Sequence, residues 1–405
     1  MAEAMAVSQP RQTWRGTFRL AVVAAALLIS GCQTMIPKGK PPPTDQPPPV
    51  ERPDEPGDIT TGLPQDKARH RVALLVPMTG ANAGVGQSIA NAANLAVLDT
   101  GGNAIRITTY DTATGAAAAA QKALAEGNTL ILGPLLSEDV RAVAPVARAR
   151  GVPLISFSND SSVAGNGTYL LGFSPAQSIR RVVEFARSKG MTRFAGLVPN
   201  GVYGQRSSNA LLRAVEASGG QVVSMQNFDR SKTSITAAIT RMSKDSAYQA
   251  VLIADNGSFA AQAVPLIRRS GGSGGATAKI LGTELWNTES GLVASVPMRG
   301  AWFASVPDNL YTQLVAKYRA RYGRAPYRLA SMGYDSVLLV TRISRDWKVG
   351  QPFPVKAMND AGGFSGIDGP FRFGRDGIAD RMLEVQQIDA TGFTTVSSAP
   401  KQFQE

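Results

Sequence analysis

Polar side chains that could bind a small ligand follow two apolar runs of the chain. Ser137 comes after the run 129–132, and the loop 156–160, Ser-Phe-Ser-Asn-Asp, comes after the run 152–155. Both runs suit strands buried on both faces, and apolar residues at helical spacing lie between them. We therefore predict two parallel strands joined by a helix. Because ligands in open parallel sheets lie beyond the carboxyl ends of the strands, Ser137 and this loop should share one rim.

Ser137 and Asp160 also have purely structural interpretations. Ser137 stands where a helix N-cap would, and Glu138 and Asp139 follow it in the first turn, where the helix dipole favours negative charge. Asp160 could simply start a turn. The sequence leaves both alternatives open.

Composition and motif context exclude several kinds of chemistry. The 405 residues include one cysteine and one histidine, Cys32 and His70, so disulfide frameworks and His/Cys metal sites are excluded by number. The run 84–89 resembles a dinucleotide fingerprint but has isoleucine in place of the third glycine. The G-x-S-x-G match at 271–275 follows a helix and has no histidine base. We predict no metal, no cofactor and no enzyme activity.

Strand and helix patterns alternate along the chain, which is typical of a doubly wound α/β sheet. Strands are expected at 71–76, 105–110, 129–132, 152–155 and 169–171, and then, as the pattern restarts, at 194–198, 221–224, 250–254, 279–282 and 301–305. Helices are expected at 310–322 and 328–343, and a hairpin from 369–373 and 383–388 around a turn at 376–377. We therefore predict an α/β fold of two lobes, each a mainly parallel sheet flanked by helices, with several crossings between them.

The first 32 residues have the features of an export signal. Three arginines precede an apolar run at 20–29 that is too short to span a bilayer. The sequence Leu-Ile-Ser-Gly-Cys at 28–32 resembles the lipobox of bacterial lipoproteins, which implies cleavage before Cys32 and lipid, such as palmitate, on that residue. Gln33 resembles the signal for outer-membrane sorting. The alternative is an ordinary signal peptide with an incidental cysteine.

A proline-rich tether, predicted to be disordered, follows the signal at 32–69, and we expect His70 to be exposed at its end. The net charge is +12, and the 34 basic and 23 acidic residues beyond the tether give +11 for the folded part. This excess favours an anionic partner such as a cell-wall polymer, a lipid headgroup or an acidic protein face. No basic run with interleaved aromatic residues occurs, which excludes nucleic acid as the expected partner.

Several motifs, in this order, resemble the type I periplasmic binding proteins of the leucine/isoleucine/valine-binding class. They are VALLVPMTG at 72–80, ILGPLLS at 131–137, VPLISFSND at 152–160, the pair Tyr203-Gly204, LGTELWN at 281–287 and GPFRFGRDGIADR at 369–381. The resemblance extends from residue 70 to about residue 389. With the lipoprotein signal and the tether, the chain is most similar to the penicillin-binding protein activators, which are lipoproteins with this fold.

The resemblance implies a ligand site between the lobes. Amino-acid binders of the class hold the ligand carboxylate with a serine after the Gly-Pro turn, here Ser137. They also use polar groups in the loop after the next strand, here Ser158 and Asp160. A tyrosine before glycine in the second lobe matches Tyr203, and the acid that takes the ligand ammonium matches Glu284.

The chain departs from the class at this site. Asp160 stands where the class often has threonine, and its carboxylate would repel the carboxylate of an amino acid. Phe157 and Trp286 are placed at the cleft wall, where they could fill the cleft. Structural alternatives are that Tyr203 and Trp286 are wall or core residues and that Glu284 is a solvated loop acid.

The leading hypothesis is an outer-membrane-anchored periplasmic lipoprotein that binds and activates a penicillin-binding protein, a peptidoglycan synthase, without being an enzyme. The alternative is a lipid-anchored solute-binding protein that serves the permease of an amino-acid ABC transporter. The expected segments are a signal peptide (1–31), the tether (32–69), lobe 1 (70–171 with 307–346) and lobe 2 (172–306 with 347–395).

Overall fold

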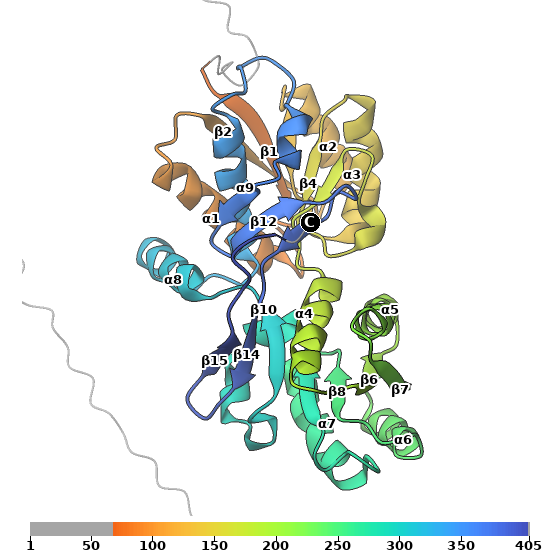
Figure 1. Ribbon diagram of the computed structural model, residues 1–405. Helices are drawn as coiled ribbons and strands as arrows, with labels where there is room; N and C mark the ends of the chain where they lie inside the picture. The colour runs from red at the N-terminus through yellow and green to blue at the C-terminus, as the bar shows by residue number, and fades with distance from the viewer. Residues whose placement is uncertain (1–67, 404–405) are drawn as a thin grey trace, which may run out of the picture. The chain divides into compact units, whose positions relative to one another are not determined.

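Two large β-sheets, one in each of two lobes, organise the chain (Figure 1). The computed structural model describes residues 68–403. The predicted signal peptide, the predicted lipid site Cys32 and the tether up to residue 67 lie outside the described residues.

The first lobe contains a five-stranded parallel sheet with strand order 2-1-3-4-5. Its strands are β1 (His70–Val76), β2 (Ile105–Asp111), β3 (Leu130–Leu132), β4 (Leu154–Ser156) and β5 (Thr168–Leu170). Its helices are α1 (Ala83–Asp99), α2 (Ala116–Ala125), α3 (Ser137–Ala149), α8 (Asn309–Tyr322) and α9 (Ala330–Ile343), with 3-10 turns η1 (Ser161–Val163) and η5 (Val355–Asn359). A small antiparallel sheet is formed by β11 (Phe364–Gly366), β12 (Gly369–Phe373) and β13 (Ala379–Arg381).

Alternation along β1 explains why this run is apolar throughout. Val72, Leu74 and Val76 pack in a core with α1 and α9, whereas Ala73 and Leu75 pack in a second core with α2 and α3. A parallel strand with helices on both faces has no side for solvent. The sheet therefore presents only its strand ends, where the loops of the predicted rim lie.

The second lobe contains a seven-stranded sheet with strand order 15-14-10-9-8-6-7. Its strands are β6 (Arg193–Pro199), β7 (Gln221–Phe228), β8 (Ala250–Ile253), β9 (Lys279–Gly282), β10 (Trp302–Ser305), β14 (Glu384–Ile388) and β15 (Phe393–Ser397). Its helices are α4 (Pro175–Ser188), α5 (Val202–Ala217), α6 (Lys232–Met242) and α7 (Gly257–Ser270), with 3-10 turns η2 (Glu284–Thr288), η3 (Ser290–Ala294) and η4 (Val296–Met298). Helices α4 and α5 cover one face and α6 and α7 the other.

The predicted two-lobed α/β fold is confirmed, and the crossings between the lobes lie at 171–174, 306–308 and 382–383. Residues 347–395, expected in the second lobe, join it only after residue 382. Trp347, Phe353 and Phe371 pack in the core of the first lobe, because the small antiparallel sheet buries its aromatic face there.

Two further expectations, one about the hairpin at 369–388 and one about His70, are wrong. The hairpin was expected to pair 369–373 with 383–388, but β12 pairs with β13, and β14 pairs with β10 and β15. The chain returns for only three residues after the turn and then crosses to the other lobe. His70 is buried and not exposed, because it begins β1 and its ring stacks on Trp347 at 3.7 Å.

Candidate functional site

The loops at the carboxyl ends of the strands enclose a cavity of about 370 Å³ between the two lobes. The first lobe contributes residues that follow β1, β3 and β4, and the second lobe contributes η2 and the start of α4. Its apolar lining consists of Val85, Leu135, Leu136, Phe157, Phe173, Leu285, Val306, Leu329, Met332 and Leu383. Its charged lining residues are Glu284, Arg328 and Arg381. The cavity is therefore mainly apolar, with three ionisable side chains at its wall.

Of the predicted site residues, Glu284 and Phe157 line this cavity. Tyr203 reaches it only through Glu284, because its hydroxyl donates to Glu284 Oε1 at 3.2 Å and lies 3.0 Å from Thr283 Oγ1. Burial raises the pKa of Glu284 to about 7. Its Oε2 atom is buried without a hydrogen-bond partner. Glu284 is therefore not a solvated loop acid.

Asp160 does not face the cavity but joins the two lobes at its edge. Arg141 of α3 donates to Asp160 Oδ2 at 2.8 Å, and Arg206 of α5, in the other lobe, forms an ion pair with Oδ1. Burial alone would raise the pKa of Asp160, but hydrogen bonds from Ser162 and the two arginines outweigh it and lower the pKa to about 2. Asp160 is thus ionised and already has partners.

The serines of the predicted rim are also occupied within the protein. Ser158 Oγ accepts the backbone N–H of Asp160 at 3.1 Å, and the N–H of Ser158 donates to Ser156 Oγ at 3.0 Å. Ser137 is the first residue of α3 and not its N-cap, which is Leu136. Its hydroxyl accepts from Arg141 Nη1 at 3.3 Å. The structure brings Ser137 and Asp160 together through Arg141, away from the cavity.

Trp286 is a core residue of the second lobe and does not form the cleft wall. It is fully buried, and its indole Nε1 donates to the carbonyl of Asp255 at 2.9 Å. Gly282 lies directly against the ring, where a Cβ atom would overlap it. The Gly-Thr-Glu-Leu-Trp motif thus places the tryptophan under the strand end and directs Glu284 to the cavity.

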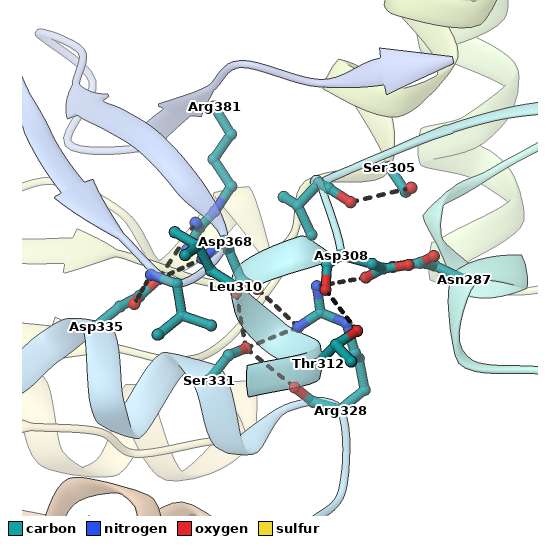
Figure 2. Close-up of polar contacts among 12 residues, drawn as sticks. Asn287, Ser305, Asp308, Leu310, Thr312, Arg328, Ser331, Asp335, Asp368 and Arg381 are labelled. Carbon is teal, nitrogen blue, oxygen red and sulfur yellow. Dashed lines mark hydrogen bonds and ion pairs between the residues drawn. The ribbon is translucent and has the colours of Figure 1, made fainter. Parts of the chain in front are cut away.

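A network of buried charges beside the cavity was not predicted (Figure 2). Arg328 donates to Asp368 Oδ1 at 2.7 Å and contacts Asp308 Oδ1 at 3.4 Å. Arg381 donates to the carbonyl of Leu171 at 2.9 Å. These residues connect the segment just before α9, the small sheet and the crossings at 171–174 and 306–308.

The second arginine of this network, Arg381, also packs against aromatic rings. The guanidinium of Arg381 lies 5.0 Å from the ring of Phe173 and 5.2 Å from that of Phe371. Its Nη1 is 3.9 Å from Asp335 Oδ2, which is too long for a hydrogen bond. Burial and the neighbouring Asp368 raise the pKa of Asp335. Of the charged residues in this network, only Arg381 falls within a motif noted in the sequence, the run 369–381.

Unpartnered polar atoms concentrate at the cavity. Among the described residues, ten buried side-chain polar atoms have no hydrogen-bond partner, and five of them belong to residues that line it. They are Glu284 Oε2, Asn287 Oδ1, Arg328 Nε, and Nε and Nη1 of Arg381. Native proteins leave few such atoms unpaired, so this wall is the place where a bound molecule or water would be most favourable.

Metal-binding clusters and membrane-spanning helices are both absent from the described residues. Residues 68–403 contain no group of three or more His, Cys, Asp or Glu side chains placed to hold a metal ion. None of the helices in that part of the chain combines the length and the apolar character needed to cross a membrane. What the arrangement can do is enclose a small, largely apolar molecule or hold the lobes at a fixed separation.

Comparisons with known proteins agree with this architecture. A curated relative, an uncharacterised protein of Rickettsia prowazekii, is 24% identical over 191 residues, which are 47% of this chain and about half (51%) of that protein. The structure of a putative branched-chain amino acid ABC transporter from Rhodospirillum rubrum has a TM-score of 0.71 at 20% identity and covers 81% of this chain and 100% of its own.

A second solved structure is the C-domain of LpoA from Haemophilus influenzae, described as a regulator of PBP1A. It has a TM-score of 0.63 at 18% identity and covers 80% of this chain and 99% of its own. At these identities the structures establish the fold alone. A family model described as periplasmic binding protein matches residues 70–393. With this match over most of its length, the chain belongs to the periplasmic binding protein family.

Proposed function

We propose that this protein is a periplasmic lipoprotein, anchored through Cys32 to the outer membrane, that binds and activates a penicillin-binding protein without catalysing a reaction. The observation that supports this most directly is the state of Asp160. Its carboxylate stands at the position where amino-acid binders of this class often have threonine, and it is paired with Arg141 and Arg206. Such a carboxylate would repel the carboxylate of a bound amino acid, and its two arginine partners are already engaged. The fold shared with the LpoA C-domain supports the same proposal.

Reconstitution tests this function. The full mature chain is mixed with the bifunctional peptidoglycan synthase of the same organism, and glycan polymerisation and peptide cross-linking are measured from labelled lipid II. We expect the rate to rise and to saturate as the protein is titrated. No change in either rate for every such synthase of the organism would reject the proposal. Turnover of lipid II by the protein alone would reject the non-catalytic part.

A second candidate is a lipid-anchored solute-binding protein of an ABC transporter. Its support is the cavity of about 370 Å³, whose wall carries half of the buried side-chain polar atoms that lack a hydrogen-bond partner within residues 68–403. The fold shared with the Rhodospirillum rubrum protein is consistent with it. Calorimetric titration with leucine, isoleucine and valine distinguishes the two functions. Binding of one ligand per chain supports the receptor, and no heat with any of them supports the regulator.

A further inference from the structure

Asp160 links three segments that no other described ion pair connects. The residue follows β4 in the first lobe, Arg141 lies on α3 of the same lobe, and Arg206 lies on α5 of the second lobe. Ser162 donates two hydrogen bonds to Asp160 Oδ1, the oxygen that also pairs with Arg206. Its N–H lies at 2.9 Å and its hydroxyl at 2.5 Å from that oxygen. Only 8% of the Asp160 side chain is exposed, against 55% for Arg141 and 26% for Arg206. The carboxylate is thus the buried centre of a bridge whose arginines approach it from solvent.

The Asp160 carboxylate is the one negative charge of this bridge. Two guanidinium groups converge on one carboxylate, so its removal would leave two cations facing each other across the lobes. Guanidinium groups prefer carboxylates as partners. The hydroxyls of Ser137 and Ser162 also touch the bridge, and both accept hydrogen bonds from its arginines. The site is an anion-binding site built from both lobes.

A second connection across the lobes lies at the C-terminal end of the chain. After β15 in the second lobe, Arg181 of α4 donates to Ser397 Oγ at 2.6 Å and to the carbonyl of Ser398 at 3.1 Å. The ring of Phe403 then lies under Arg372 of the first lobe, 4.7 Å from the guanidinium carbon. This tail adds a fourth passage of the chain between the lobes. It connects the lobes at a place separate from Asp160.

We propose that Asp160 is a built-in ligand: its carboxylate fills an anion site formed by Arg141 and Arg206 and holds the two lobes together without a small molecule. The inference goes beyond the proposed function, because it does not depend on which partner the protein binds. It has a specific chemical consequence. A variant that lacks this carboxylate should contain an empty site for a small free carboxylate, and acetate is the simplest probe.

The experiment measures the distance between the lobes by electron paramagnetic resonance. Spin labels are attached to the exposed positions Ala142→Cys on α3 and Leu212→Cys on α5, in the full chain with Cys32→Ser. With Asp160 intact, we expect one narrow distance distribution. Asp160→Ala should add a population at longer distance, and sodium acetate should convert it back, whereas sodium chloride at equal ionic strength should not.

Three variants separate the bridge from other roles of Asp160. Asp160 also caps η1, and Asp160→Asn keeps an oxygen for the N–H of Ser162 but removes the charge. If Asp160 acted only as a cap, this variant would keep the short distance. Arg206→Gln should open the lobes from the other side, and acetate should not restore it. Asp360→Ala is the matched control, because it removes an exposed pair with Arg342 inside the first lobe.

The outcomes decide between the alternatives. A longer distance in both Asp160→Asn and Arg206→Gln, with no change in Asp360→Ala, supports the bridge. An unchanged distance in both overturns it, even if Asp160→Ala fails to fold. If Asp160→Ala opens but acetate does not close it, the lobes are bridged, but the idea of a built-in ligand is wrong.

Discussion

Two ionic clusters hold the lobes, one at the edge of the cleft and one beside the crossings, and they differ in their contact with water. At the edge, Asp160 is 8% exposed but its partners Arg141 and Arg206 are 55% and 26% exposed. Beside the crossings, Asp368 is 0% exposed and its partner Arg328 only 7%. Charges in contact with solvent are screened and can exchange partners, whereas buried charges depend on each other completely.

This difference suggests different roles for the two clusters. We call Asp160, Arg141 and Arg206, with the serines that contact them, the edge cluster, and Arg328, Asp368, Asp308 and Arg381 beside the crossings the hinge cluster or hinge network. Asn287 of the second lobe donates to Asp308 Oδ1 at 3.1 Å, so the hinge network also spans both lobes. Arg328, Asp368 and Arg381 of this network are buried, so removal of one partner leaves an unpaired charge out of contact with water. The edge cluster has no such constraint. We therefore expect changes in the hinge to affect folding and changes at the edge to affect lobe separation.

The largest expected effect is that of Arg328→Met. Removal of the guanidinium leaves the fully buried Asp368 without the donor that now lies at 2.7 Å. Breaking a buried ion pair from one side costs about 3–5 kcal/mol. Urea unfolding should show this loss in the free energy of unfolding. The matched control is Arg342→Met, which removes an exposed pair with Asp360 and should cost less than about 1 kcal/mol. Equal losses in the two variants would mean that burial does not distinguish the clusters.

The sheets could be predicted from the sequence because the pattern of apolar residues within each segment indicates a strand or a helix. The run 72–76 is apolar at every position because both of its faces are covered, and that pattern is visible without the fold. The hinge network could not be found in this way. Arg328 and Asp368 are 40 residues apart, and neither belongs to a motif. The same limit explains the tail, where β14 pairs with the distant strand β10 and with β15, and not with β12 as expected.

Of the site, the sequence located the loops correctly but not the direction of their side chains. Glu284 and Phe157 line the cavity as expected. Ser158 and Asp160 were placed on the right loop, but their side chains bind the loop itself and Arg206 of the other lobe. A spacing rule cannot foresee this, because it does not contain the partner that arrives from a distant helix.

The next effect in size concerns pH and Glu284, on the cavity wall. Because burial raises its pKa from 4.5 to about 7, its stabilising contribution is complete below pH 4.5 and is lost as the pH rises through 7. Glu284→Gln cannot ionise and should gain stability relative to the parent protein, on the order of 1–3 kcal/mol between pH 5 and pH 8. Urea unfolding across this range measures the difference. A constant difference would show that Glu284 is hydrated.

Asp160 should give the opposite pH dependence with a smaller effect. Its pKa is lowered from 3.8 to about 2, so its contribution is complete above pH 3.8 and is lost as the pH falls through 2. Relative to Asp160→Asn, the parent protein should be more stable at pH 6 by on the order of 1–2 kcal/mol. Salt should reduce this difference, because both arginines touch solvent. A stability difference that does not change with salt would mean that the Asp160 pairs are as shielded from solvent as those of the hinge cluster.

The smallest effect is expected for Ser137→Ala, which tests the outer end of the edge cluster. An N-cap serine is worth about 1 kcal/mol, but α3 is preceded by Leu136 as its N-cap, and no side chain there accepts a backbone N–H. Ser137 contributes only a 3.3 Å hydrogen bond from the exposed Arg141. The variant should therefore stay within about 0.5 kcal/mol of the parent protein. Ser231→Ala is the matched comparison, because Ser231 caps α6 by accepting the N–H of Ser234 at 3.1 Å, and it should lose the full amount of about 1 kcal/mol. Equal losses of stability in the two variants would mean that Ser137 caps its helix in solution. The same hydroxyl could then not orient Arg141. The edge cluster would in that case consist of Asp160, Ser162 and the two arginines alone.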